Sequence, residues 1–110
     1  MAKFEALEVA LQTVHALGKL LPKIKRHDRK LADQLKQACD SAASCLSEGA
    51  HRVGRDRPHL YTIAGGSAAE VRTHLAVAVA WGYLAHAEAD PAASLADRVA
   101  AMCWRLTHPR

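Results

Sequence analysis

The chain has 110 residues, of which half are hydrophobic and only 5% aromatic, and its formal net charge is +4. This length fits one small domain, 1–110, and the abundance of alanine favours helices over strands. The longest apolar run, 75–85, is about half the length that a bilayer span requires, and no secretory leader pattern follows Met1. We therefore expect a soluble, cytoplasmic protein with no membrane partner.

The first predicted helix covers 3–21, where apolar residues recur at steps of three and four. Pro22 should end this helix, because proline removes a backbone donor and restricts the residue before it. Residues 22–27 are then expected to form a short basic loop. Asp28 follows as the predicted N-cap of the second helix.

The second predicted helix covers 28–51, and the rest of the chain is organised around it. Its apolar residues again recur at steps of three and four, as on the core-facing side of a bundle helix. The second half of this stripe contains only small residues: Ala38, Ala42, Cys45 and Gly49. Another helix can therefore approach it closely.

The third predicted helix covers 58–87 and contains Gly65 and Gly66. These glycines either break the helix or lie within a continuous helix and permit close packing. We favour the continuous helix because the apolar stripe, which includes Trp81, keeps its register across them. Residues 75–85 are apolar on all sides, and a bundle of this size covers only one side of each helix. The surplus apolar face predicts self-association.

Asp90 and Pro91 form the N-cap and first turn typical of a helix start, so a fourth helix is predicted over 90–107. Trp104 lies off its apolar stripe, a position more typical of an oligomer contact than of a base-stacking platform. Short connections make consecutive helices antiparallel. The sequence thus predicts an all-α, antiparallel up-down-up-down four-helix bundle that self-associates.

The positive charge is concentrated in the first half of the chain. Residues 1–57 hold 11 of the 15 lysines and arginines against 7 of the 11 acids. Consecutive loops of such a bundle lie at opposite ends, so we expect two basic zones that attract RNA or DNA. The alternative is a solvated surface without a ligand. The nucleic-acid-binding residues expected around the first loop are Lys19, Lys23, Lys25, Arg26, Arg29 and Lys30. Those expected around the second loop are Arg52, Arg55 and Arg57.

Four residues are assigned structural polar roles: Glu48, Arg52, Ser67 and Glu70. Glu48 and Arg52 have the spacing and order that favour a helical ion pair. Ser67 and Glu70 lie beside the third apolar stripe, and a buried carboxylate needs a partner. We expect Arg52 to be that partner.

No set of residues predicts catalysis, a metal or a cofactor. Di-iron bundles need two Glu-x-x-His motifs and two further glutamates, whereas Glu48-x-x-His51 occurs once. Cys39, Cys45 and Cys103 contain no Cys-x-x-Cys pair and are expected to be reduced residues of the core. We therefore do not expect an enzyme.

Three blocks of the sequence resemble a known family: QLKQACDSAASCLSEGAHR (34–52), LYTIAGGSAAEV (60–71) and WGYL (81–84). They are similar to the four-helix-bundle proteins encoded in intervening sequences of bacterial 23S ribosomal RNA genes. The resemblance implies a homopentamer and no catalytic residues. A similar protein, the accessory variability determinant of diversity-generating retroelements, is a basic pentamer that associates with a reverse transcriptase and nucleic acid. The likeness implies the same kinds of partner here.

The sequence therefore favours a non-enzymatic, oligomeric nucleic-acid-binding or scaffolding protein. A ring of subunits would repeat the basic loops and increase avidity. The alternative is a protein–protein adaptor, or a protein encoded in an intervening sequence that has no specific nucleic-acid ligand.

Overall fold

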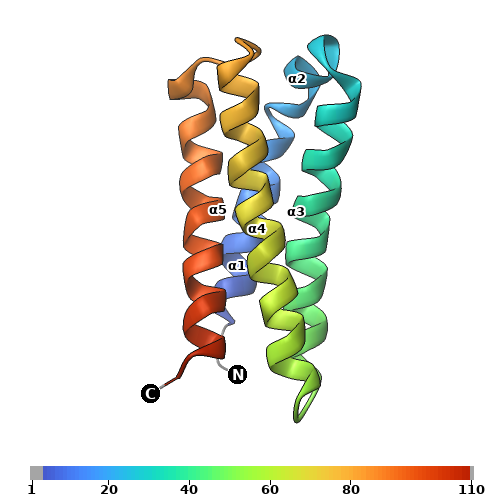
Figure 1. The fold of residues 1–110 in the computed structure, drawn as a ribbon, viewed down its shortest axis with the longest axis vertical. Helices are drawn as coiled ribbons and strands as arrows, with labels where there is room; N and C mark the ends of the chain where they lie inside the picture. Colours follow the sequence, from blue (N-terminus) through green and yellow to red (C-terminus); the bar gives the residue numbers. More distant parts are fainter. Residues whose placement is uncertain (1–3, 110) are drawn as a thin grey trace.

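The structure, a computed structural model, describes residues 4–109, and the regular elements in this range are all helices. Their bounds are α1 (Glu5–Gly18), α2 (Leu21–His27), α3 (Arg29–Ala50), α4 (Asp56–Ala80) and α5 (His86–Thr107). Figure 1 shows the four long helices side by side, with consecutive ones running in opposite directions. The predicted antiparallel helical bundle is confirmed, and the short α2 is an additional element.

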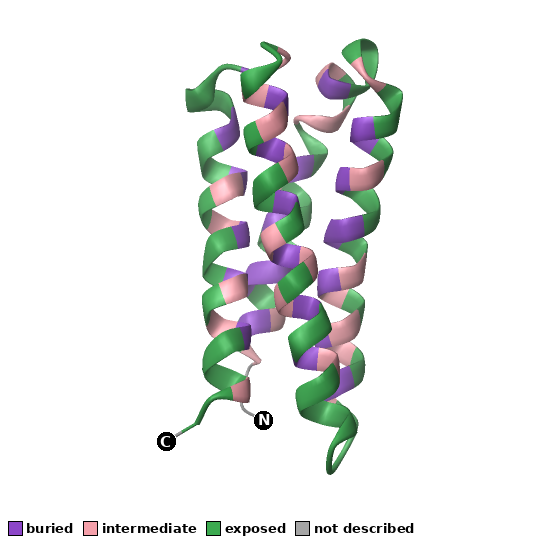
Figure 2. Cartoon of the chain, viewed as in Figure 1, coloured by how far each residue is buried: buried purple, intermediate pink, exposed green. Residues whose placement is uncertain are grey.

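The long helices form a four-sided bundle in which α3 packs on α4, α4 on α5, α5 on α1 and α1 on α3. Their buried residues lie on the inward-facing stripe of each helix (Figure 2). One core cluster surrounds Leu35 and Leu75 in the upper half of Figure 1, and a second surrounds Leu46 and Tyr61 in the lower half. Many of the buried residues are alanines, which lets the helices approach closely.

Residues 22–27 lie in α2, so the prediction of a loop that begins where Pro22 ends a helix is wrong. Pro22 lies in the first turn of α2, where a missing N–H removes no helical hydrogen bond. Ile24 is fully buried in the upper core cluster and fastens α2 to the bundle. Asp28 is the N-cap of α3 as predicted, and its Oδ1 accepts a hydrogen bond from the N–H of Leu31 at 3.0 Å.

Helix α4 runs without a break through Gly65 and Gly66, as predicted. The backbone at Gly65 lies so close to α5 that an added Cβ would be 3.0 Å from the Cβ of Cys103. Gly66 faces open space. Only the first of the two glycines is therefore required for close packing.

Helix α4 ends at Ala80, earlier than predicted, because Gly82 takes a φ of 82° and turns the chain. Trp81 consequently lies outside the core stripe, and 68% of its surface is exposed. Val77 and Val79 are half-buried against the upper core cluster. The apolar surplus from which self-association was predicted is therefore smaller than the sequence suggests.

Helix α5 begins at His86 rather than at Asp90. The carboxylate of Glu88 accepts a hydrogen bond from the N–H of Ala85 and so caps the helix at its true start. Pro91 lies inside the helix, where its missing N–H removes one helical hydrogen bond. The predicted end of this helix near residue 107 is confirmed.

Candidate nucleic-acid interface

The first basic cluster surrounds α2 at the upper end of the bundle in Figure 1. We call it the upper basic zone, and its members are Lys19, Lys23, Lys25, Arg26, Arg29 and Lys30. One member follows α1, three lie on α2, and two form the first turn of α3. Helix α2 therefore brings cations from three consecutive elements to one end of the molecule.

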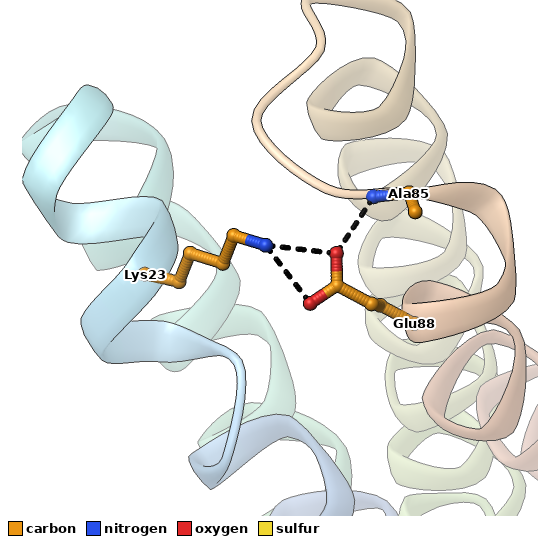
Figure 3. Close-up of polar contacts among 3 residues, drawn as sticks. All are labelled: Lys23, Ala85 and Glu88. Carbon is orange, nitrogen blue, oxygen red and sulfur yellow. Dashed lines mark hydrogen bonds and ion pairs between the residues drawn. The ribbon is translucent and has the colours of Figure 1, made fainter.

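Lys23 has a structural partner in this zone. Its Nζ lies 2.9 Å and 3.0 Å from the two carboxylate oxygens of Glu88, at the start of α5 (Figure 3). Oε1 of Glu88 also accepts the hydrogen bond from the N–H of Ala85, at 2.9 Å. These two donors, Ala85 first and Lys23 second, lower the pKa of Glu88. Lys23 thus ties α2 to α5.

The other five members of the upper basic zone are exposed and form no ion pair within residues 4–109. Arg29 and Lys30 lie in the first turn of α3, where the helix dipole disfavours positive charge. Their position therefore adds nothing to the stability of α3. Unpaired cations gathered at one end instead raise the local potential and favour an anionic ligand.

The second basic cluster, which we call the lower basic zone, lies at the opposite end of the bundle, where α3 connects to α4 (Figure 1). Its three arginines are Arg52, Arg55 and Arg57. Arg52 lies 3.9 Å from Glu48 and 3.7 Å from Asp56. Arg57 donates to the carbonyls of Gly49 and Ala50 and so satisfies the last turn of α3. Two of the three arginines thus have structural partners.

The expected polar partners occur in part. Glu48 pairs with Arg52, and Ser67 donates a hydrogen bond to Oγ of Ser41 at 3.0 Å, which links α4 to α3. The pairing of Glu70 with Arg52 is wrong. Glu70 lies about 21 Å along α4 from its first residue, whereas Arg52 precedes that helix. Its exposed carboxylate instead lies 3.3 Å from Nε2 of His74.

Sequence reasoning missed that the connection between α4 and α5 joins the upper basic zone. The hydroxyl of Tyr83 donates to Oδ2 of Asp28 at 3.3 Å, and its ring stacks on His27. The predicted third helix includes the WGYL block and places Trp81 on its apolar stripe. Gly82, with an aromatic residue on each side, was the signal for a turn.

The cysteines and the possible metal ligands offer little further candidate chemistry. Burial raises the pKa of the Cys39 thiol to about 11, and that of the Cys103 thiol likewise to about 11, so both are poor nucleophiles. Cys45 is half-buried and lies 3.9 Å from the hydroxyl of Ser41. Within residues 4–109, no three His, Cys, Asp or Glu side chains are grouped as metal ligands. No helix in this range is long and apolar enough to cross a membrane.

These features define the class of protein: an all-helical bundle whose upper end carries exposed, unpaired cations. The chain belongs to the family of 23S rRNA-intervening sequence proteins, whose model matches residues 3–105. A similar solved structure is a protein of unknown function from the S23 ribosomal protein family of Bacteroides thetaiotaomicron VPI-5482. It has a TM-score of 0.79 at 14% identity, with 93% of this chain and 97% of that one covered, which shows a shared fold. No curated protein matches the chain.

Proposed function

We propose that this protein is a non-enzymatic nucleic-acid-binding or scaffolding protein that holds RNA or DNA at the upper basic zone. One observation carries the proposal: five exposed cations gather around α2 without an ion pair within residues 4–109. Such cations bind phosphates with little sequence preference and with a steep dependence on salt. The lower basic zone contributes less, because Arg52 and Arg57 have structural partners.

We further propose that the protein acts as a homo-oligomer, with a pentamer suggested by the family likeness. Leu11, 54% exposed, and Val14 lie one turn apart on the outside of α1. Beside them, α1 and α5 flank a groove of about 680 Å³ that Leu11 and Leu95 help to line. An outward apolar stripe next to a groove supports a contact between copies of the chain. Each added subunit would repeat the upper basic zone and increase avidity.

The test reverses the charge of basic residues that have no structural partner in the described part of the bundle. Lys25→Glu combined with Arg26→Glu alters the upper basic zone and leaves the Lys23–Glu88 pair intact. Lys25→Glu alone is also measured, because Arg55→Glu in the lower basic zone changes the net charge by the same amount and is its matched control. Binding to a fluorescent 20-nucleotide RNA should weaken about 10-fold or more in the double variant at low salt, and the slope of log K against log salt should flatten. The control should change binding much less.

Failure of the wild-type protein to retain RNA or DNA at low salt would refute the nucleic-acid proposal. The protein–protein adaptor would then take its place, and a protein partner such as a reverse transcriptase, suggested by the family likeness, would be sought first. Equal losses in Lys25→Glu and in Arg55→Glu would show that net charge, rather than the upper basic zone, determines binding.

A further inference from the structure

Three aromatic rings lie in nearly parallel planes beside the upper basic zone. The ring of Tyr83 stacks on that of His27, with centroids 5.0 Å apart and planes 10° apart. The ring of Trp81 stacks on Tyr83 as well, at 6.4 Å and 18°. His27 is the last residue of α2, directly after Lys25 and Arg26. The stacked rings therefore adjoin two of the unpaired cations along the chain.

The backbone beneath these rings is fixed. The N–H of Gly82 donates to the carbonyl of Val79, and the N–H of Tyr83 donates to that of Ala78, both at 2.9 Å. With Gly82 at a positive φ, these two bonds form a Schellman closure of α4. The hydroxyl of Tyr83 also bonds to Asp28, the N-cap of α3. The backbone that carries Trp81 and Tyr83 is thus held in a defined turn.

Trp81 is exposed, with 68% of its surface accessible, whereas Tyr83 is half-buried. Its indole is held in the plane orientation of Tyr83 and leaves apolar surface open to solvent. A flat aromatic surface beside unpaired cations has the two parts that proteins use for single-stranded nucleic acid: a ring on which a base stacks and charges that follow the phosphates. A base inside a duplex is already stacked on both faces and cannot use such a ring.

We propose that Trp81 is a stacking platform for an unpaired base, and that the ligand of the upper basic zone is single-stranded nucleic acid. Lys25 and Arg26 hold the phosphates, while Tyr83, itself stacked on His27, supports the indole. This inference rests on the proposed function, since it names the class of nucleic acid that the same zone binds. It requires no sequence preference, because every base has a face that can stack.

A second tryptophan provides the matched control. Trp104 is 60% exposed and stacks on His108 at 4.0 Å and 7°, near the C-terminal end of α5. That end of the bundle carries the lower basic zone, two of whose arginines have structural partners (Figure 1). The two tryptophans therefore share exposure and a stacked neighbour but differ in the cations around them.

The test measures binding of Trp81→Ala, Trp81→Leu, Trp81→Phe and Trp104→Ala to three oligomers of equal length, of which the two single-stranded ones also carry the same charge. These are a single-stranded dT12, an abasic 12-mer that has phosphates but no bases, and a 12-base-pair duplex. Trp81→Ala and Trp81→Leu should weaken dT12 binding about 5- to 100-fold and leave abasic binding unchanged. Trp81→Phe should restore part of the affinity, and Trp104→Ala should bind as wild type.

Fluorescence supplies a direct readout. The chain has two tryptophans, so Trp104→Phe leaves Trp81 as the single indole emitter. Its emission should be quenched by dT12 but not by the abasic oligomer. If Trp81→Ala bound dT12 as tightly as wild type, the stacking platform would be overturned. The proposed function would still stand, provided that the Lys25→Glu/Arg26→Glu variant lost binding.

Two other results would count against the platform. If Trp81→Leu lowered the mass of the oligomer in light scattering, Trp81 would be a subunit contact instead. If the wild-type protein bound the duplex as tightly as dT12, the ligand would not be single-stranded. If wild type bound none of the three oligomers at low salt, the proposed function itself would fall, and the platform with it.

Discussion

Gly49 is buried in α3 directly against the ring of Tyr61 on α4. A Cβ at this position would lie 2.7 Å from Cε1 of Tyr61 and 3.3 Å from Cβ of Leu60. The tyrosine is itself buried in the lower core cluster and packs on Phe4, so its ring has little room to move. Close approach of α3 and α4 thus depends on the absence of a side chain at one residue.

We expect Gly49→Ala to lower the free energy of unfolding by about 1–3 kcal/mol through overpacking. Gly66→Ala is the control, because an added Cβ there meets open space in the middle of α4. It should raise stability by up to about 1 kcal/mol, since alanine favours helix over glycine. Urea unfolding of both variants provides the measurement, and equal shifts in one direction would contradict the assignment of close packing to Gly49.

Glu70 illustrates how little an exposed charge contributes. Its side chain is 54% exposed and its partner is His74, one turn along the same helix. We expect Glu70→Ala to change the free energy of unfolding by less than about 0.5 kcal/mol, because surface ion pairs contribute little. A loss of several kcal/mol in thermal unfolding would show that this carboxylate has a buried partner after all.

Two contacts hold α2 against the upper end of the bundle, one apolar and one an ion pair. Ile24 inserts into the core, and Lys23 reaches Glu88 on α5. The folded pKa of Glu88 lies below its ordinary value of 4.5. A carboxyl with a depressed folded pKa stabilises the fold above about pH 4.5, and this stabilisation is lost as the pH falls through the folded pKa.

We therefore expect Glu88→Gln to melt at a lower temperature than wild type at pH 7, with a difference that shrinks progressively below pH 4.5. Lys23→Met should lower the melting temperature less, because the hydrogen bond from Ala85 to the carboxylate remains. Circular dichroism melts across pH 3–7 test both points. A difference that grew on acidification would reverse the assigned sign.

The long helices could be predicted because their apolar residues repeat in a single register, as on α3 and in α4 across Gly65 and Gly66. The ends of the helices were harder to predict, because a proline can either end a helix or lie in the first turn of one. Pro22 reads equally as the end of one helix or the first turn of the next, and Asp90 with Pro91 imitates a helix start. Tertiary contacts decided these cases: Ile24 had a core to enter, and Glu88 had the N–H of Ala85 to cap.

At the scale of the whole molecule, the two basic clusters could be placed at opposite ends from loop order alone, and Figure 1 shows them there. Which of their lysines and arginines have structural partners could not be predicted. Glu88 is far from Lys23 in sequence, and the carbonyls that Arg57 caps belong to the preceding helix. Which cations remain unpaired is therefore a property of the folded bundle. The turn at Gly82, which brings Tyr83 to α2, was equally inaccessible to a periodicity argument.

The mass of the protein in solution tests whether it self-associates. We expect light scattering at micromolar concentration to give a homo-oligomer, near a pentamer, rather than the 11.9 kDa of one chain. Leu11→Glu with Val14→Glu should lower that mass, since charges on the outward stripe of α1 oppose burial between subunits. A monomer in the wild type would refute self-association, and an unchanged oligomer in the double variant would move the contact to another face.

The position of Asp28 between α2 and α3 affects how much conformational entropy the protein loses when a ligand binds. Its N–H closes α2 on the carbonyl of Ile24 at 2.8 Å, and its side chain opens α3, so the two helices share one residue with no flexible spacer. The joint is stiff, and the conformational entropy of α2 is already lost when the chain folds. A ligand held by α2 and its neighbours would therefore meet a preorganised surface, and little of its binding free energy would be spent on ordering the protein.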